Sequence, residues 1–466
     1  MNSAPTLPSG LLLSFYGDDY TGSSAVMEVL SFAGLPTVLF LQPPSPDDLA
    51  RFAGYRGIGI AGIARSQSPV WMDAHLPAIF RTLADLHAPL AHYKVCSTFD
   101  SSPEIGSIGR AIDNGAPLLG GGWHPLVVAA PALARYQVFG NLFAVADGRG
   151  HRLDRHSTMS RHPVTPMHEA DVRLHLARQT KRNIGLIDFL ALKDGTAKRR
   201  LSEIRAAGAE IVAIDVLDEE TLAEAGRLIW ENRGQRLFAI GSQGVEYALV
   251  AHWRAAGLLA APTDDFHAAP AERIAVVSAS CAPTTAGQIA QAARHGFAPQ
   301  RIDATLAVDE RAWNGELGRA AGEALAALEA GQSPLAFTSL GPDDPAIAAT
   351  QAAMAASGVS ADTVNARIGA GLGRLLDRVM RLGGLVRGVI AGGDTSGHAA
   401  QALGIRALTA LAPIAPGAPL CRAHGAPDAP RREIIFKGGQ MGPPDFFRAA
   451  RRGAAAGMAG QRRTGT

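Results

Sequence analysis

The sequence lacks the signatures of several common enzyme classes. It contains no GxxxxGKS/T phosphate loop, no GxGxxG after its first predicted strand, no GxSxG nucleophile elbow and no HExxH metalloprotease motif. Cysteine is scarce: Cys96, Cys281 and Cys421 are widely spaced and form no CxxC pair, which argues against a disulfide framework or a zinc cluster. These absences disfavour P-loop enzymes, dinucleotide dehydrogenases and metalloproteases, and they fit a reducing compartment.

An excess of one charge and long apolar runs are absent as well. The formal net charge is +2, and no block of Lys or Arg alternates with aromatic residues as in a nucleic-acid groove. The apolar run at residues 11–13 is too short for a signal peptide core or a membrane span. We expect a cytoplasmic protein with no nucleic-acid or membrane partner, and a homo-oligomer is left open.

The sequence does contain a repeating alternation of short apolar runs and Ala-rich helical stretches over its 466 residues. This rhythm predicts parallel strands covered by helices, and the length favours two domains. Residues 257–272 are rich in Ala and Pro and lack periodicity, so we place the domains at residues 1–260 and 272–466. The predicted fold is two α/β domains with mainly parallel sheets and ligands in the inter-domain cleft. Residues 120–166 look irregular and predict a functional or disordered loop.

The first candidate motif, GDDYTG at residues 17–22, follows an apolar strand and leads into a helix. Ligands of open α/β sheets bind at such carboxyl ends of strands. Asp18 and Asp19 are candidates for a general base and for an acceptor of substrate hydroxyls. The alternative is that Asp19 or Thr21 only caps the helix.

The second candidate motif ends another strand with one lysine, one aspartate and a run of hydroxyls at residues 92–103. Such a polar run suits an anionic, polyhydroxylated ligand, and an arginine after the preceding strand could add a bidentate contact. A Ser/Thr-rich turn without function is the alternative. The candidate contacts are Arg65, Lys94, Ser97, Thr98 and Asp100.

Three turns in the second domain each follow an apolar strand and combine small residues with hydroxyls. Glycine lets a backbone approach a phosphate closely, and helix N-termini offer free N–H groups to it. We therefore predict a nucleotide site there. Its candidate residues are Ser278, Ser280, Gly392, Gly393, Asp394, Thr395, Ser396, Gly438 and Gly439.

Other candidates carry less weight. The histidines at 151, 156, 162 and 168 fit no zinc spacing and are interpreted as structural, so no protein metal site is predicted. Cys281 lies before a predicted helix N-terminus, but no partner histidine can be located for it, so it is interpreted as a small packing residue.

Six segments, taken in order, resemble the four-carbon acid sugar kinase family over nearly the whole chain. They are GDDYTG, KVCSTFDSSPEIGSIG, HPVTPMHEADVRLHLARQ, VSASCAPTTAGQ, GGDTSG and FKGGQMG. The resemblance implies an N-terminal domain that binds an acid sugar and a C-terminal domain that binds ATP. It implies phosphorylation of a terminal hydroxyl of compounds such as threonate, erythronate or 3-oxo-tetronate. Three segments depart from the family pattern: SASCA replaces SGSCS, GGDTS replaces GGETS, and GGQMG replaces the usual ending.

The hypothesis is thus a kinase that uses ATP and Mg²⁺ and a small anionic sugar acid, with domain closure bringing the two ligands together. Asp19 is the first candidate for the catalytic base and Asp100 the second. Arg65 and Lys94 would recognise the substrate carboxylate. The rival hypotheses are a nucleotide-independent sugar-acid isomerase or lyase and a metabolite-sensing binding protein.

Overall fold

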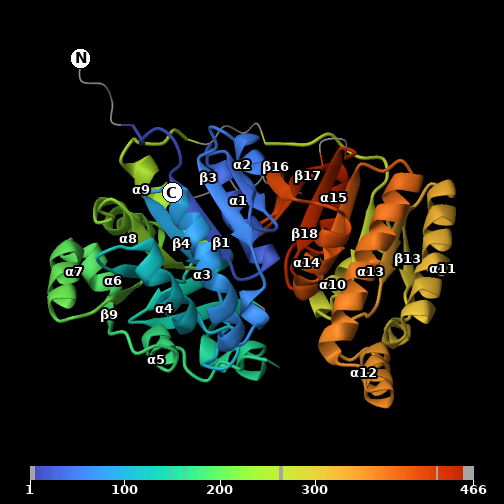
Figure 1. The fold of residues 1–466 in the computed structure, drawn as a ribbon, viewed down its shortest axis with the longest axis horizontal. Helices are drawn as coiled ribbons and strands as arrows, with labels where there is room; N and C mark the ends of the chain where they lie inside the picture. Colours follow the sequence, from blue (N-terminus) through green and yellow to red (C-terminus); the bar gives the residue numbers. More distant parts are fainter. Residues whose placement is uncertain (1–5, 147, 163, 262–265, 427–428, 455–466) are drawn as a thin grey trace. The chain divides into compact units, whose positions relative to one another are not determined.

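The computed structural model describes residues 6–146, 148–162, 164–261, 266–426 and 429–454 and divides into two compact units, residues 1–263 and 264–466 (Figure 1). The side chains of residues 393–395 are outside this description. Each unit holds a mostly parallel sheet flanked by helices, so the prediction of two α/β domains with mainly parallel sheets is confirmed. Within the described ranges, no helix has both the length and the apolar character needed to cross a membrane.

The main sheet of the N-terminal unit runs in the order β2-β3-β1-β4-β11-β5-β10-β9, with every described pair parallel. Most of its strand residues are buried, as expected for parallel strands covered on both faces. The strands are β1 (Leu13–Gly17), β2 (Thr37–Phe40), β3 (Gly57–Ala61), β4 (Leu90–Lys94), β5 (His124–Val127), β9 (Ile184–Ile187), β10 (Ile211–Ile214) and β11 (Leu237–Gly241).

Helices connect these strands, and several begin at a Ser or Asp cap: Asp19 starts α1, Ser68 starts α3 and Asp218 starts α8. Helices α1 and α9 contact each other, as do α3 and α4. The helices are α1 (Tyr20–Phe32), α2 (Pro46–Ala50), α3 (Pro69–Asp85), α4 (Ile108–Leu119), α5 (Val172–Ala177), α6 (Phe189–Lys193), α7 (Ala197–Ala206), α8 (Glu219–Glu231) and α9 (Gly244–Ala255).

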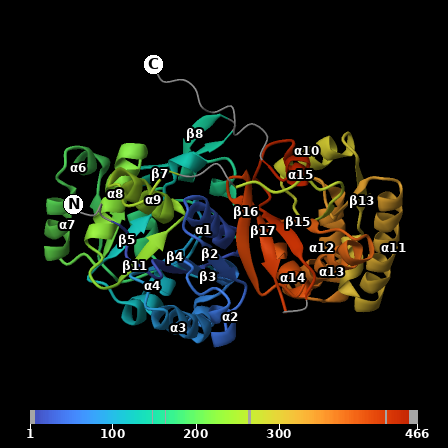
Figure 2. The same ribbon diagram turned by 90° about the horizontal axis from the view of Figure 1, so that it is seen from above.

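A small antiparallel sheet follows β5 and consists of β6 (Arg135–Val138), β7 (Asn141–Ala146) and β8 (Arg149–Arg152). In Figure 2, β7 and β8 lie on the opposite side of the N-terminal unit from α3 and α4. The turn between β6 and β7 has positive φ at Phe139 (50°) and Gly140 (79°), and both backbone N–H groups donate to the buried Asp215 carboxylate. The prediction of an irregular loop over residues 120–166 is therefore wrong for this segment. Its hairpin is anchored by a residue some 75 positions later in the chain, which local patterns do not show.

The sheet of the C-terminal unit runs in the order β13-β14-β12-β15-β18-β17-β16. Its first five strands are parallel, and β17 pairs antiparallel with both β18 and β16. The strands are β12 (Ala275–Ser278), β13 (Phe297–Arg301), β14 (Ser333–Phe337), β15 (Arg387–Ala391), β16 (Ala407–Ala415), β17 (Ala418–His424) and β18 (Arg432–Lys437).

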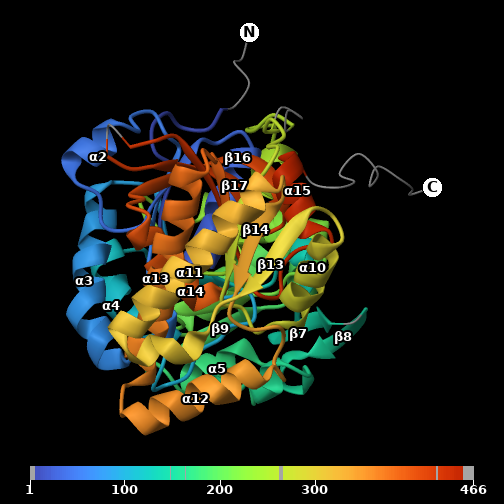
Figure 3. The same cartoon turned by 90° about the vertical axis from the view of Figure 1, so that its right-hand side faces the viewer.

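Helices cover both faces of this second sheet. Figure 3 shows α11 and α13 on one side of β13 and β14 and α10 and α15 on the other, and each of these helix pairs is in contact. The apolar core includes Val276, Leu335, Val389 and Ile435 from four neighbouring strands. The helices are α10 (Pro283–Ala293), α11 (Glu310–Glu329), α12 (Pro345–Ser357), α13 (Ala361–Leu382), α14 (Gly393–Ala402) and α15 (Phe446–Arg452).

The two units share one arrangement of their first four strands. In each unit the second and third strands lie on one side of the first strand and the fourth lies on the other, giving β2-β3-β1-β4 and β13-β14-β12-β15. The second and third strands are thus added on one side of the first strand, and the fourth strand is added on the opposite side, although all four strands are parallel. Such a change of side opens a crevice at the carboxyl ends of the strands, where α/β proteins bind ligands.

Candidate active site

The first site cluster lies at the carboxyl edge of the sheet in the N-terminal unit. Asp18 and Asp19 follow β1, Lys94 is the last residue of β4, and Arg65 lies in the short 3₁₀ segment Ala64–Ser66 beyond β3. Because β1 pairs with both β3 and β4 in register at Gly17, the ends of all three strands coincide. The sheet therefore brings these four predicted site residues together.

Arg65 holds the two carboxylates. Its Nη2 lies 2.6 Å from Asp18 Oδ1 and 2.7 Å from Asp19 Oδ1, and its Nε lies 3.2 Å from Asp18 Oδ2. Asp18 is only 1% exposed. Burial raises the pKa of Asp18, and the guanidinium of Arg65 acts in the opposite direction. Both oxygens of Asp18 are thus already bound by the protein.

Asp19 has a second role as the N-cap of α1. Its Oδ1 accepts a hydrogen bond from Gly22 N at 3.0 Å, so Asp19 does cap the helix. Among the described residues, Asp19 Oδ2 has no hydrogen-bond partner, and the side chain is 17% exposed. Capping through one oxygen leaves the other oxygen available to a ligand.

Lys94 is buried beside Asp19, with 2% exposure. A Cβ atom placed on Gly22 would lie 2.3 Å from Asp19 Oδ1 and 2.4 Å from Lys94 Nζ. Gly22 therefore leaves the space into which both side chains extend. The two cations Arg65 and Lys94 balance the charge of Asp18 and Asp19.

The segment after β4 forms a compact polar turn. Thr98 Oγ1 donates to Asp100 Oδ1 at 2.7 Å and lies 3.0 Å from Cys96 Sγ. Burial raises the pKa of Cys96 to about 11, so it stays a thiol near neutral pH. Ser97 is half-buried in the same turn. The turn therefore presents hydroxyls and a carboxylate close to the acid pair.

Sequence reasoning missed two groups at the same edge of the sheet. The turn Ser242-Gln243, bounded by Gly241 and Gly244, follows β11, the strand between β4 and β5, and Ser242 Oγ donates to Val128 O at 2.7 Å. A glycine-bounded turn after an apolar run was a usable signal for it. Arg135, the first residue of β6, lies within electrostatic reach of Cys96 and Asp100, and no local pattern singles it out.

The second cluster lies at the carboxyl edge of the sheet in the C-terminal unit, where backbone hydrogen bonds join the turns after four adjacent strands. Thr338 N donates to Ser278 O at 3.0 Å, Ala279 N to Ala391 O at 3.0 Å, and Gly392 N to Lys437 O at 2.9 Å. The structure thus brings the predicted residues Ser278 and Gly392 to one edge. Three further predicted residues, Gly393, Asp394 and Thr395, belong to the segment whose side chains the structure does not describe.

Ser280 and Ser396 stabilise these turns. Ser280 Oγ donates to Thr285 Oγ1 at 3.1 Å and accepts from Ala282 N at 3.2 Å. Ser396 Oγ donates to Gly392 O across the first turn of α14. Both side chains shape the turns through contacts with the protein itself.

Lys437 is the central side chain of this cluster. It has 0% exposure, and its Nζ donates to Thr285 Oγ1 at 2.8 Å, to Gly438 O at 3.0 Å and to Gly439 O at 3.2 Å. Burial lowers its pKa to about 7. A Cβ on Gly439 would lie 2.7 Å from Ser280 Oγ, so the turns after β18 and β12 pack directly on each other.

Gln288 of α10 holds residues 441–443, which follow the turn after β18. Its Nε2 lies 3.0 Å from Met441 O, 3.0 Å from Gly442 O and 2.9 Å from Pro443 O. Sequence reasoning selected neither Gln288 nor Lys437. A signal for Lys437 was present, since it is the single lysine after residue 264.

Other features lie away from these edges. Within the described ranges, no three His, Cys, Asp or Glu side chains gather as metal ligands would. His162 Nδ1 accepts from Thr165 N at 3.1 Å, which is a structural role.

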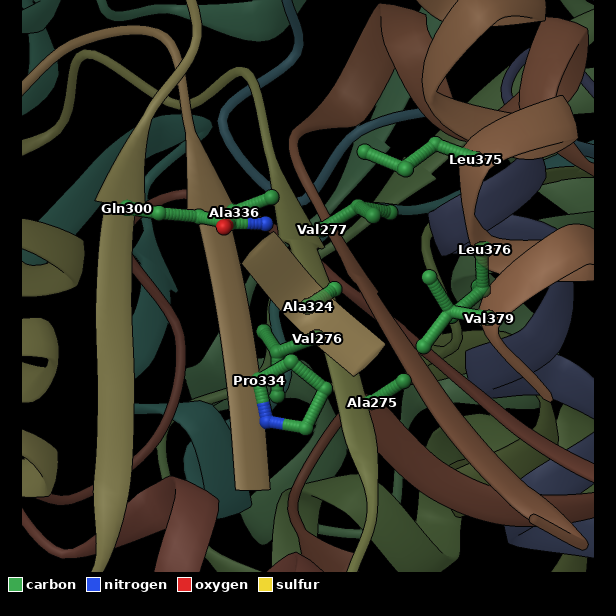
Figure 4. A pocket seen from close by; sticks show the side chains of 10 residues that line it. All are labelled: Ala275, Val276, Val277, Gln300, Ala324, Pro334, Ala336, Leu375, Leu376 and Val379. Carbon is green, nitrogen blue, oxygen red and sulfur yellow. The ribbon is translucent and has the colours of Figure 1, made fainter. Parts of the chain in front are cut away.

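Figure 4 shows an apolar cavity of about 10 Å³ between the strands and α13, large enough for about one water molecule. A hollow of about 400 Å³ lies at the opposite, amino edge, beside the buried Arg387–Glu433 ion pair.

Comparison with known proteins shows to which family the chain belongs. Residues 13–249 match the family described as "Sugar-binding N-terminal domain", and residues 275–447 match "Nucleotide-binding C-terminal domain". A 3-oxo-isoapionate kinase of Paraburkholderia graminis is 52% identical over 459 residues, which cover 98% of this chain and 97% of that protein. The chain belongs to the four-carbon acid sugar kinase family. The resemblance inferred from the sequence motifs is confirmed.

A more distant member agrees with this assignment, and solved structures share the fold. A 3-oxo-tetronate kinase of Cupriavidus necator is 30% identical and covers 97% of this chain and 99% of its own. A crystal structure from Salmonella typhimurium LT2 superposes with a TM-score of 0.75 at 23% identity, covering 95% of this chain and 99% of that chain. One from Haemophilus influenzae gives 0.68 at 23% identity, covering 94% and 98%. At these identities, the structures show a shared fold.

Proposed function

We propose that this protein is an ATP-dependent kinase that phosphorylates a hydroxyl group of a small oxo acid sugar. The carrying observation is the 52% identity, over nearly both full lengths, to a protein named 3-oxo-isoapionate kinase. Relatives named 3-oxo-tetronate kinases are about 30% identical or less. 3-Oxo-isoapionate is therefore the first candidate substrate and 3-oxo-tetronate the second.

The N-terminal cluster supports the acceptor half of this proposal. Asp19 Oδ2 is the carboxylate oxygen of the acid pair that the described residues leave unbound, so Asp19 is the proposed base for the proton of the attacking hydroxyl. Asp18, with both oxygens on Arg65, orients that arginine. Ser97, Thr98 and Asp100 are proposed to hydrogen-bond the remaining hydroxyls, with Asp100 as the second candidate for the base.

The C-terminal cluster fits a nucleotide. Its joined turns place small residues at the carboxyl ends of β12, β15 and β18, and α14 begins at the same edge. The N-terminus of a helix is a favourable place for a phosphate, because its first N–H groups have no partner within the helix. ATP supplies the phosphoryl group, and Mg²⁺ is proposed to arrive with its phosphates. Because the described side chains form no metal-ligand group, no step is assigned to the cation.

The experiment is a turnover assay with purified protein, ATP and Mg²⁺ against a panel of sugar acids. We expect ADP release that depends on 3-oxo-isoapionate or 3-oxo-tetronate, and a phosphorylated product detectable by mass spectrometry. A kinase assignment is refuted if no member of the panel, threonate and erythronate included, stimulates ADP release.

The rival functions give different results in the same experiment. An isomerase or lyase would convert a sugar acid without ATP, which NMR of the reaction mixture detects. A metabolite sensor would be stabilised against thermal unfolding by the acid and would show no turnover.

A further inference from the structure

The cations predicted to bind the substrate carboxylate already face carboxylates of the protein, so the negative charge of the substrate needs another partner. Arg65 and Lys94 are the predicted carboxylate ligands, but Arg65 binds Asp18 and Asp19 through Nε and Nη2, and Lys94 extends beside Asp19. Two cations therefore face two carboxylates of the protein itself. An additional anion at this cluster would bring the local charge to minus one, which burial disfavours.

Arg135 is a cation at the same edge without such a partner. Among the described residues it forms no ion pair, and its Nε is buried with no hydrogen-bond partner. Its Nη1 donates to Leu133 O at 3.1 Å and to Ala134 O at 3.3 Å, so backbone carbonyls fix the direction of the guanidinium. Burial lowers the pKa of Arg135, and nearby Asp100 only partly opposes that effect. Such a guanidinium is preorganised for an anion.

The small antiparallel sheet explains how Arg135 reaches this position. Strand β5 neighbours β11, which neighbours β4, so the carboxyl end of β5 lies at the same edge as Lys94. The chain then turns through residues 131–133, with Ala134 in the left-handed region at φ 54°, and delivers Arg135 as the first residue of β6. Asp215 holds the far end of that hairpin on the main sheet.

We propose that Arg135 binds the carboxylate of the acid sugar and selects acids over neutral sugars, while the cluster of Asp18, Asp19, Arg65 and Lys94 handles the reacting hydroxyl. This inference rests on the proposed function, because it assigns the substrate's charged group within that same site. Arg135 is a substrate-binding residue in this account and takes no part in proton transfer.

The test compares R135M with the wild type and with R149M, which changes an exposed arginine of the same small sheet. For R135M we expect KM for the sugar acid to rise about 10- to 100-fold, the range for a lost charged hydrogen bond, with KM for ATP unchanged. R149M should behave like the wild type. R135K should recover part of the loss, since it restores charge without the planar fork.

A neutral substrate analogue separates recognition from structural damage. The primary amide of the sugar acid lacks the negative charge, so the wild type should prefer the acid strongly, and R135M should lose most of that preference. A misfolded variant would lose both substrates in proportion. If R135M keeps the wild-type preference for the acid, Arg135 does not bind the carboxylate.

Failure of the proposed function gives a distinct result. If the wild type phosphorylates no sugar acid, calorimetric titration with the same acids still tests Arg135: binding that R135M weakens keeps the anion site, and no binding to the wild type rejects it.

Discussion

Lys437 should make the stability of the C-terminal unit rise with pH. Its Nζ is fully buried, and its three acceptors, Thr285 Oγ1, Gly438 O and Gly439 O, are all uncharged. Loss of hydration therefore dominates and brings its pKa from the ordinary 10.5 to about 7. The unfolded chain keeps its proton up to its ordinary pKa, whereas the folded chain loses it above pH 7.

The sign and size follow from this difference. Between the two pKa values the unfolded state binds more protons, so the free energy of unfolding increases with pH by about 1.4 kcal/mol per pH unit. Integrated from pH 6 to pH 9, Lys437 contributes a gain of roughly 3 kcal/mol. K437M carries no titrating group at this position, so the wild type should gain this amount relative to it. The control K181M changes an exposed lysine and should keep the wild-type slope.

Guanidinium titrations at several pH values measure this effect. Trp313 is the one tryptophan after residue 264 and is buried in α11, so its fluorescence, obtained by difference from W313F, reports on the C-terminal unit. NMR of ¹³C-labelled lysine gives the pKa directly, with the Lys437 signal assigned by its loss in K437M. A midpoint above pH 9, or equal pH slopes for the wild type and K437M, would refute the argument.

Three further predictions concern the two clusters. D19N should lower kcat by roughly 10²-fold or more if Asp19 is the base, with ADP binding by calorimetry unchanged; near-normal turnover would remove that role. G22A should reduce kcat/KM for the sugar acid about 10-fold by displacing Lys94 and Asp19, while thermal unfolding shifts by only a few degrees. The matched variant G287A, in open space on α10, should keep full activity and stabilise by about 0.5–1 kcal/mol. Q288A releases three backbone carbonyls of residues 441–443 and should raise KM for ATP severalfold with KM for the acid unchanged; the reverse pattern would contradict the nucleotide assignment.

The local part of the site could be predicted from the sequence. An apolar strand, a short polar turn and a helix start are neighbours in the chain, so Asp18 and Asp19 were identifiable at a strand end. Lys94 was identifiable for the same reason. The capping role of Asp19 and its role toward a ligand were posed as alternatives, but the two oxygens of the carboxylate make them compatible.

The parts that depend on strand order could not be predicted. Arg135 matters because β5 lies two strands from β4, and that order is set by pairing between residues more than 100 positions apart. The burial of Lys437 likewise depends on Thr285 and Phe446, which come from α10 and α15. The small sheet escaped prediction because its strands are short and its turn is held by Asp215, far along the chain.

The shared order of the first four strands bears on how such a chain can change during evolution. Most of the residues proposed to face a ligand occupy turns at strand ends, whereas the buried strands and helix faces behind them carry the packing. Substitutions in the turns of one unit leave the core of that unit and the turns of the other unchanged. A lineage could therefore move to a new acceptor by altering the turns after β1, β4 and β5 while its nucleotide turns stay constant, so acceptor preference should diverge faster among relatives than the use of the nucleotide.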